Sequence, residues 1–120
     1  MRYRCPASRG RKIALVFDRV NPQEAQSRLQ NGAVLVDVRE RDEFEAARVA
    51  GATLIPLSEF GERYTELPQG QEIVLICAGG VRSARAAEYA ASHGYTVTNL
   101  EGGINAWAAA GLPVETGGTP

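Results

Sequence analysis

The chain of 120 residues is poor in cysteine and histidine, the side chains that often bind zinc or form a nucleophile–base pair. Its two cysteines, Cys5 and Cys77, lie far apart and match neither a zinc spacing nor a Cys-x-x-Cys motif. A Cys–His protease pair would have to use His93, the one histidine of the sequence. Because His93 precedes Gly94 where a helix is expected to end, it is better explained as a C-terminal helix residue. We therefore expect no metal site and no Cys–His protease.

The sequence also lacks a segment that could be a signal peptide or a membrane span. The apolar run at residues 13–17 is far too short for either. Hydrophobic residues make up 44% of the chain, aromatic residues 7%, and the net charge is −1. These values are typical of a soluble globular protein, so we expect one cytoplasmic domain with no membrane association.

Acidic residues are scarce at the start of the chain. Up to residue 19 there are six basic residues and one acidic residue, a net charge of +5, which leaves −6 for the rest. The mildly acidic body argues against a nucleic-acid-binding face on the folded part. We expect residues 1–12 to form a flexible basic arm, with an interaction tail as the alternative, residues 13–116 to fold, and residues 117–120 to form a tail. The glycine-rich end is expected to be frayed from residue 115 onward.

Apolar runs alternate with helical patterns along the folded part. Strands are expected at residues 14–20, 33–38, within 51–56, 72–76 and 96–100. Helices are expected at residues 22–29, 42–47, 58–64, 84–92 and 104–110. Asn21 and Ser58 are expected to cap two of these helices, and Phe44 and Trp107 to lie in the core. The alternation predicts an α/β fold with a mainly parallel sheet and helices on both faces.

The stretch from residue 72 to residue 91 holds the strongest candidate site, because a buried strand leads through a short loop into an alanine-rich helix. The loop has the sequence Cys77-Ala78-Gly79-Gly80-Val81-Arg82-Ser83. Gly79 and Gly80 can adopt positive φ, which lets successive N–H groups form an anion-binding concavity at a helix N-terminus. Such an environment lowers the pKa of a cysteine, so Cys77 is the candidate nucleophile. The alternatives are a buried structural cysteine and a plain strand-to-helix turn.

Arg82 has two functional interpretations: it binds an anion at the loop mouth, or it braces the loop through a carboxylate such as Asp37 or Glu43. A third interpretation is a surface arginine, although a cation at a helix N-terminus is unfavourable. Asp37 and Arg39 lie at the carboxyl end of a strand, where open α/β sheets bind ligands. We expect these two residues to brace the site and not to act in catalysis, with a solvated pair as the alternative.

Five motifs follow one another between residues 17 and 115. They are Asp37-Val38-Arg39-Glu40 with Glu43-Phe44, Gly51-Ala52 with Ile55-Pro56, the loop at residues 77–83, Leu100-Glu101-Gly102-Gly103-Ile104-Asn105-Ala106-Trp107, and Gly111-Leu112-Pro113-Val114. In this order they resemble a single-domain rhodanese, a sulfurtransferase. The resemblance implies a five-stranded parallel sheet with helices on both faces, and a reaction that needs no cofactor or metal.

The resemblance also implies a ping-pong transfer of sulfur. The thiolate of Cys77 attacks the outer sulfur of a donor such as thiosulfate, sulfite leaves, and cyanide or a thiol then takes the sulfur from the Cys77 persulfide. The N–H groups of residues 78–83 stabilise the anionic donor and the persulfide. Expected partners are a small sulfur-donor anion or a low-molecular-weight persulfide, and a thiol acceptor such as a thioredoxin-like or sulfur-acceptor protein. We expect a monomer or a weak homodimer that binds no nucleic acid.

One departure from the family bears on the donor. The larger two-domain thiosulfate enzymes place an arginine where this chain has Glu43. A carboxylate at this position could pair with Arg82 and leave less positive charge for a dianion, so a persulfide or polysulfide is the expected donor.

Other functions remain as alternatives. The cell-cycle phosphatases have a similar fold, but their loop is Cys-x5-Arg, whereas residues 77–82 form Cys-x4-Arg, which leaves less room for a phosphoryl group. An oxyanion reductase, a persulfide relay to a protein partner in cofactor or tRNA thiolation, and a non-catalytic docking module are further alternatives. Cys5 as a resolving thiol for Cys77 is an interpretation that no sequence feature supports.

Overall fold

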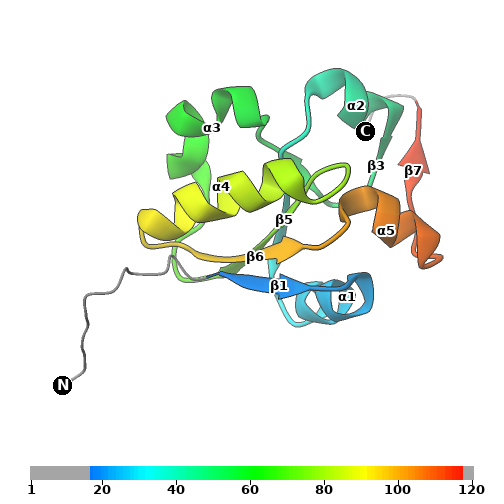
Figure 1. Cartoon of the computed structure of the whole chain (residues 1–120), viewed down its shortest axis with the longest axis horizontal. Coiled ribbons are helices and arrows are strands. Elements are labelled where there is room, and N and C mark those ends of the chain that lie inside the picture. The colour runs from blue at the N-terminus through cyan, green and yellow to red at the C-terminus, as the bar shows by residue number, and fades with distance from the viewer. Residues whose placement is uncertain (1–16, 118–120) are drawn as a thin grey trace.

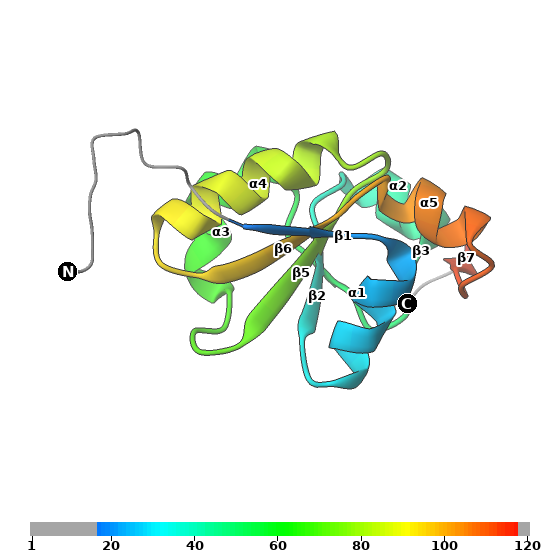
Figure 2. The same cartoon turned by 60° about the horizontal axis from the view of Figure 1, so that its bottom comes forward.

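Five parallel strands form the centre of the fold in a computed structural model, which describes residues 17–117. They lie in the order β1-β6-β5-β2-β4 (Figure 1, Figure 2). Their bounds are β1 Asp18–Val20, β2 Val34–Asp37, β4 Thr53–Leu54, β5 Glu72–Ile76 and β6 Thr96–Leu100. The predicted five-stranded parallel sheet is confirmed. The predicted arm at residues 1–12 and Cys5 lie outside the described residues.

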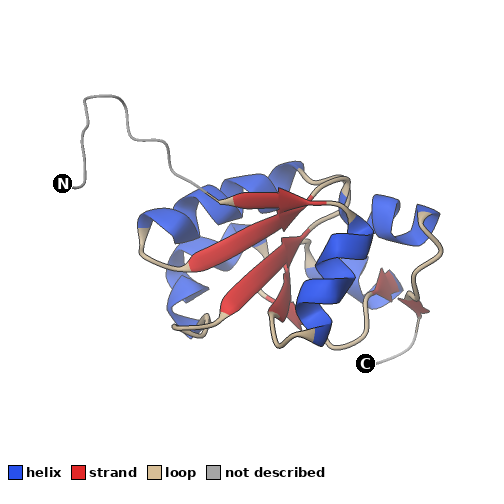
Figure 3. Ribbon diagram, turned by 90° about the horizontal axis from the view of Figure 1, so that it is seen from below, coloured by secondary structure: helices blue, strands red, loops and turns tan. Residues whose placement is uncertain are grey.

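Helices cover both faces of the sheet (Figure 3). Their bounds are α1 Pro22–Gln30, α2 Arg41–Ala46, α3 Leu57–Arg63, α4 Val81–Ser92 and α5 Gly103–Ala109, with a 3-10 helix at Tyr64–Glu66. On one face α3 and α4 pack through Phe60 and Ala87, and on the other α1 and α5 pack through Ala25 and Trp107. Phe44 and Trp107 are buried, as predicted. No helix within residues 17–117 combines the length and the apolar character needed to cross a bilayer.

Strand β5 is the most deeply buried strand and supports the candidate loop. Its four apolar residues, Ile73 to Ile76, are 0% exposed. Ile73 and Leu75 face α3 and α4, whereas Val74 and Ile76 face α1 and α5, because successive side chains of a strand point to opposite faces. Burying each of these side chains contributes about 1.5–3 kcal/mol to folding. The loop at residue 77 therefore begins on a fixed base.

The register of the sheet brings two strand ends together. In the parallel pair of β2 and β5, Val36 lies opposite Leu75 and Asp37 lies opposite Ile76. The segments that follow both strands therefore leave the sheet at the same edge, and α2 begins beside the loop that precedes α4 (Figure 1).

The helix starts agree with the sequence in part. Asn21 caps α1, since its side-chain oxygen accepts a 2.8 Å hydrogen bond from the Glu24 N–H. Ser58 does not cap α3, so that prediction is wrong. The helix begins at Leu57 after Pro56, and the Ser58 hydroxyl instead donates to Glu40 at 3.0 Å. The helix predicted at residues 84–92 begins three residues earlier, at Val81.

Residues Glu115 and Thr116 are more ordered than predicted. β3 Ala47–Arg48 and β7 Glu115–Thr116 form an antiparallel pair, and the Gly117 N–H donates to the Ala46 carbonyl at 2.8 Å. The buried Arg48 holds this pair, because its guanidinium donates to the Gly117 carbonyl and lies 3.5 Å from the Glu115 carboxylate. The expectation of fraying from residue 115 is therefore wrong for Glu115 and Thr116.

Candidate functional site

The sulfur of Cys77 lies just beyond β5 and is surrounded by hydrogen-bond donors. It accepts from the Gly80 N–H at 3.0 Å and lies 3.3 Å from the Ser83 hydroxyl oxygen. Cys77 is 1% exposed, and this burial raises the pKa of its thiol. Hydrogen bonds from the Ser83 hydroxyl and from the backbone N–H groups of Ser83, Gly80 and Gly79 outweigh burial, so the pKa lies below its ordinary value. The buried position matches the structural alternative, but the donors stabilise a thiolate.

One glycine of the pair makes the turn. Gly80 has φ +97° and is the N-cap of α4, whereas Gly79 does not have positive φ, so the prediction for Gly79 is wrong. A Cβ at Gly80 would lie 2.9 Å from the Gly102 nitrogen. The turn therefore requires glycine at position 80, both for its φ and for the close approach of the chain at Gly102.

The start of α5 holds the loop from the other side. The Ile104 N–H donates to the Cys77 carbonyl at 2.7 Å, and the Asn105 N–H donates to the Ala78 carbonyl at 3.1 Å. Gly103, at φ +60°, is in such close contact with these two carbonyls that a Cβ would overlap them. The backbone of the first loop residues is thereby fixed.

Replacing Gly103 with alanine is expected to destabilise the protein by at least about 2 kcal/mol. The positive φ is strained for alanine, and the new Cβ would overlap the carbonyl oxygens of Cys77 and Ala78. Thermal unfolding followed by circular dichroism measures the loss. The matched control is Gly79→Ala, where φ is not positive and no atom lies within 4 Å of the added Cβ. Its expected effect is within about 0.5 kcal/mol. Equal losses for the two variants would show that α5 does not hold the loop in this way.

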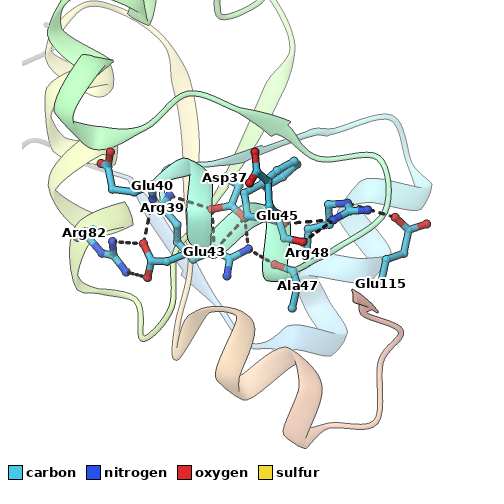
Figure 4. Close-up of polar contacts among 10 residues, drawn as sticks. Asp37, Arg39, Glu40, Glu43, Glu45, Ala47, Arg48, Arg82 and Glu115 are labelled. Carbon is cyan, nitrogen blue, oxygen red and sulfur yellow. Dashed lines mark hydrogen bonds and ion pairs between the residues drawn. The ribbon is translucent and has the colours of Figure 1, made fainter. Parts of the chain in front are cut away.

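Arg82 braces the loop through Glu43 (Figure 4). Its two terminal nitrogens lie 2.8 and 2.9 Å from the two Glu43 oxygens, a bidentate pair between α4 and α2. Both side chains are about one-third exposed, at 33% and 34%. Of the interpretations left open by the sequence, the geometry supports the brace to Glu43; the brace to Asp37 and the unpaired surface arginine are not observed.

Asp37 and Arg39 form a second, buried brace (Figure 4). The Arg39 guanidinium donates to the Asp37 carboxylate at 2.8 Å and to the Ala47 carbonyl at 2.6 Å. Asp37 is 1% exposed and Arg39 is 5% exposed, so the solvated pair is not observed. This pair links the end of β2 to the end of α2, the helix that carries Glu43.

The Glu43 carboxylate is strongly stabilised in its charged form. Hydrogen bonding to Arg82, and secondarily to the Glu40 N–H, lowers its pKa to about 2. Because the folded pKa is below the unfolded pKa, Glu43 contributes stability that is fully present above about pH 4.5 and is lost as the pH falls toward 2.

Glu43→Gln is therefore expected to be less stable than the parent protein at pH 7, with a difference that shrinks between about pH 4.5 and pH 2. Urea unfolding at a series of pH values measures it. Glu62→Gln, a change on the exposed surface of α3, is the control and should follow the parent protein at every pH. A difference for Glu43→Gln that stays constant with pH would contradict the ion pair.

Sequence reasoning missed Asn99, which lies in β6 and is 3% exposed. Its side-chain oxygen lies 2.5 Å from the Ser83 hydroxyl oxygen, and its amide nitrogen donates to the Gly80 carbonyl at 3.2 Å. A signal was available, since asparagine is depleted in strands and a buried one needs polar partners. Within residues 17–117, no cluster of three or more His, Cys, Asp or Glu side chains is arranged to hold a metal ion.

The fold and this loop define a class of protein, and sequence comparison identifies it. The model of the rhodanese-like domain matches residues 21–110, so the chain belongs to the rhodanese-like domain family. A thiosulfate sulfurtransferase of Glaesserella parasuis is 32% identical over 103 residues, which cover 84% of this chain and 95% of that protein. A crystal structure of a rhodanese-related protein from Thermoplasma volcanium superposes with a TM-score of 0.78 at 31% identity, covering 82% of this chain and 98% of that one.

Some relatives are longer than this chain. An uncharacterised protein of Bacillus subtilis is 42% identical over 76 residues, which cover 62% of this chain and 60% of that protein. An HTH-type transcriptional regulator of Mycobacterium tuberculosis is 37% identical over 103 residues, covering 83% of this chain but 46% of that protein. The same kind of domain thus occurs within proteins of different length and role.

Proposed function

We propose that this protein is a sulfurtransferase that carries sulfane sulfur as a persulfide on Cys77. The observation that carries the proposal is the environment of the Cys77 sulfur, which lies at the N-terminal end of α4 within hydrogen-bond distance of the Gly80 N–H and the Ser83 hydroxyl. The lowered pKa of the Cys77 thiol increases its thiolate fraction, and the thiolate is the nucleophile that sulfur transfer needs.

The transfer has two half-reactions. In the first, the Cys77 thiolate attacks the outer sulfur of the donor, a new S–S bond forms, and the donor's own S–S bond breaks. The leaving group, sulfite from thiosulfate or glutathione thiolate from glutathione persulfide, takes the bonding electron pair. In the second, cyanide or an acceptor thiolate attacks the outer sulfur, and the electron pair of the broken bond returns to the Cys77 sulfur. Backbone N–H groups of the loop, such as that of Gly80, are fixed before the reaction and stabilise the anion on the Cys77 sulfur without rearranging.

The Arg82–Glu43 pair favours a donor of low charge. The charge of Arg82 acts on Cys77. However, both terminal nitrogens of Arg82 already donate hydrogen bonds to the Glu43 carboxylate. A thiosulfate dianion approaching the thiolate therefore gains little from this arginine. The reacting end of a persulfide carries at most one negative charge, so its approach to the thiolate depends less on a free cation. We infer that low-molecular-weight persulfides are better donors than thiosulfate.

Steady-state transfer to cyanide tests both parts of the proposal. We expect kcat/KM with glutathione persulfide to exceed that with thiosulfate by about tenfold, the effect of one modest charge interaction. Glu43→Gln should narrow this ratio by freeing Arg82, whereas Glu59→Gln, the same change in a surface pair on α3, should not. Transfer from neither donor would reject the proposed function, and a preference for thiosulfate would reject the donor preference alone.

A persulfide relay to a protein acceptor is the second candidate. Val81, the first residue of α4 and four residues after Cys77, is 72% exposed, so its apolar side chain is available to contact a protein acceptor that approaches Cys77. The relay uses the same Cys77 persulfide and differs in the acceptor. Phosphatase activity is not proposed, because the loop has four residues between cysteine and arginine.

A further inference from the structure

The hydroxyl of Ser83 has two acceptors and one proton. Its oxygen lies 2.5 Å from the Asn99 side-chain oxygen and 3.3 Å from the Cys77 sulfur. A serine hydroxyl can donate one hydrogen bond at a time, so these two acceptors compete. All three residues are almost fully buried, at 0%, 3% and 1% exposure for Ser83, Asn99 and Cys77, so water does not supply an alternative partner.

Both distances are those of a hydrogen bond, since a sulfur acceptor lies farther from its donor than an oxygen acceptor does, so the proton can go to either partner. When the Ser83 hydroxyl donates to Asn99, a lone pair of its oxygen faces the Cys77 sulfur. That lone pair can accept from a protonated thiol, but it faces a thiolate unfavourably. Asn99 is itself held in place, because its amide nitrogen donates to the Gly80 carbonyl. The bond to Asn99 therefore suits the thiol form of Cys77, and the bond to the sulfur suits the thiolate.

We propose that Asn99 is a positioning residue that withdraws the Ser83 proton from Cys77, so that the Ser83 hydroxyl turns to the sulfur only when the sulfur carries the negative charge. The hydroxyl donates to the Cys77 thiolate, and it returns to Asn99 once the sulfur is bonded. This inference rests on the proposed function, because in the persulfide the charge has moved to the outer sulfur. Asn99 thus keeps the thiolate basic, and a more basic thiolate is a stronger nucleophile.

Other charges near the sulfur do not change in the pH range of the test. Arg82 is paired with Glu43 of α2, and Arg39 is paired with Asp37 at the end of β2. Carboxylates and guanidinium groups keep their charges between about pH 6 and pH 10. A titration in that range therefore reports Cys77 and its hydrogen bonds.

The test is the pH dependence of Cys77 alkylation by iodoacetamide, measured by mass spectrometry on the peptide that contains Cys77, which separates it from Cys5. Asn99→Ala frees the Ser83 proton for the thiolate, so the midpoint should fall by about one pH unit, the shift expected for one hydrogen bond to a charged group. Ser83→Ala should raise the midpoint. In the double variant, Asn99→Ala should no longer lower it. The matched control is Asn105→Ala, an exposed asparagine of α5, which should leave the midpoint unchanged.

A purely structural role for Asn99 gives a different result. Loss of its bond to the Gly80 carbonyl would loosen the loop and raise the midpoint, whether or not Ser83 is present. A raised or unchanged midpoint in Asn99→Ala, or an equal fall in the Ser83→Ala background, overturns the proposal. If Asn99→Ala does not fold, Asn99→Val, which suits a strand and also lacks the acceptor, replaces it. The assay uses no sulfur donor, so its outcome is independent of whether the protein transfers sulfur.

Discussion

Cys77→Ser is expected to reduce sulfur transfer by more than about a thousandfold, because a serine hydroxyl cannot form the persulfide. The fold should persist. The serine side chain has the same shape as that of cysteine and is only somewhat smaller, and its oxygen can accept the same hydrogen bond from the Gly80 N–H, so we expect a stability change of about 1 kcal/mol or less. Transfer from glutathione persulfide to cyanide, together with the melting temperature, measures both effects.

The second cysteine provides the control for this variant. Cys5→Ser is expected to keep full transfer, since nothing in the sequence supports Cys5 as a resolving thiol. Retained transfer in Cys77→Ser, or its loss in Cys5→Ser, would mean that the sulfur is not carried where the proposal assigns it.

Arg82→Ala is expected to lower kcat/KM by about tenfold to a hundredfold and to lower the melting temperature by several degrees. The variant leaves the Glu43 carboxylate without its bidentate partner, so an unpaired negative charge lies beside the loop in which the persulfide forms. It also removes the link between α4 and α2 (Figure 4). Double variants that combine Arg82→Ala with Glu43→Gln should recover part of the loss, because the unpaired charge is gone.

The matched control is Arg85→Ala on the same helix. Arg85 is exposed on α4, three residues beyond Arg82, and its loss should change neither rate nor melting temperature appreciably. If Arg82→Ala behaved like Arg85→Ala in both measurements, Arg82 would be a surface arginine and the loop would not depend on the pair.

Local patterns were sufficient to predict most of the fold. The apolar run that forms β5 and the glycines after it predicted the strand, the loop and the helix around Cys77. The alternation of such runs predicted the parallel sheet and its helical cover. These features depend on neighbouring residues, which is why one sequence is enough to find them.

Partner choice at long range could not be predicted in the same way. Asp37 and Glu43 were both within reach of Arg82 in the sequence argument, because Asp37 ends β2 and Glu43 follows shortly after it. The structure decides between them, since Asp37 turns inward to Arg39 and Glu43 lies on α2, facing α4. The same limit hid Asn99, whose partners Ser83 and Gly80 are far from it in the chain.

Two other errors also have long-range causes. The pairing of β3 with β7 was missed because its residues are far apart in the chain; the Arg48–Gly117 hydrogen bond beside it spans 69 positions. Two-residue polar strands also show too little alternation of apolar and polar residues to be recognised in the sequence. Ser58 was expected to cap α3 because its type suits a cap. Its hydroxyl finds the Glu40 carboxylate instead, a contact that sequence spacing does not reveal.

The most direct test of the proposed mechanism is the mass of the protein after brief exposure to a sulfur donor. The protein is incubated with glutathione persulfide and, separately, with thiosulfate, and then treated with cyanide. We predict a gain of one sulfur, about 32 Da, on the peptide that contains Cys77, larger with glutathione persulfide and removed by cyanide. If neither donor adds sulfur while the Cys77 thiol still reacts with an alkylating agent, Cys77 does not carry sulfur and the proposed function is wrong.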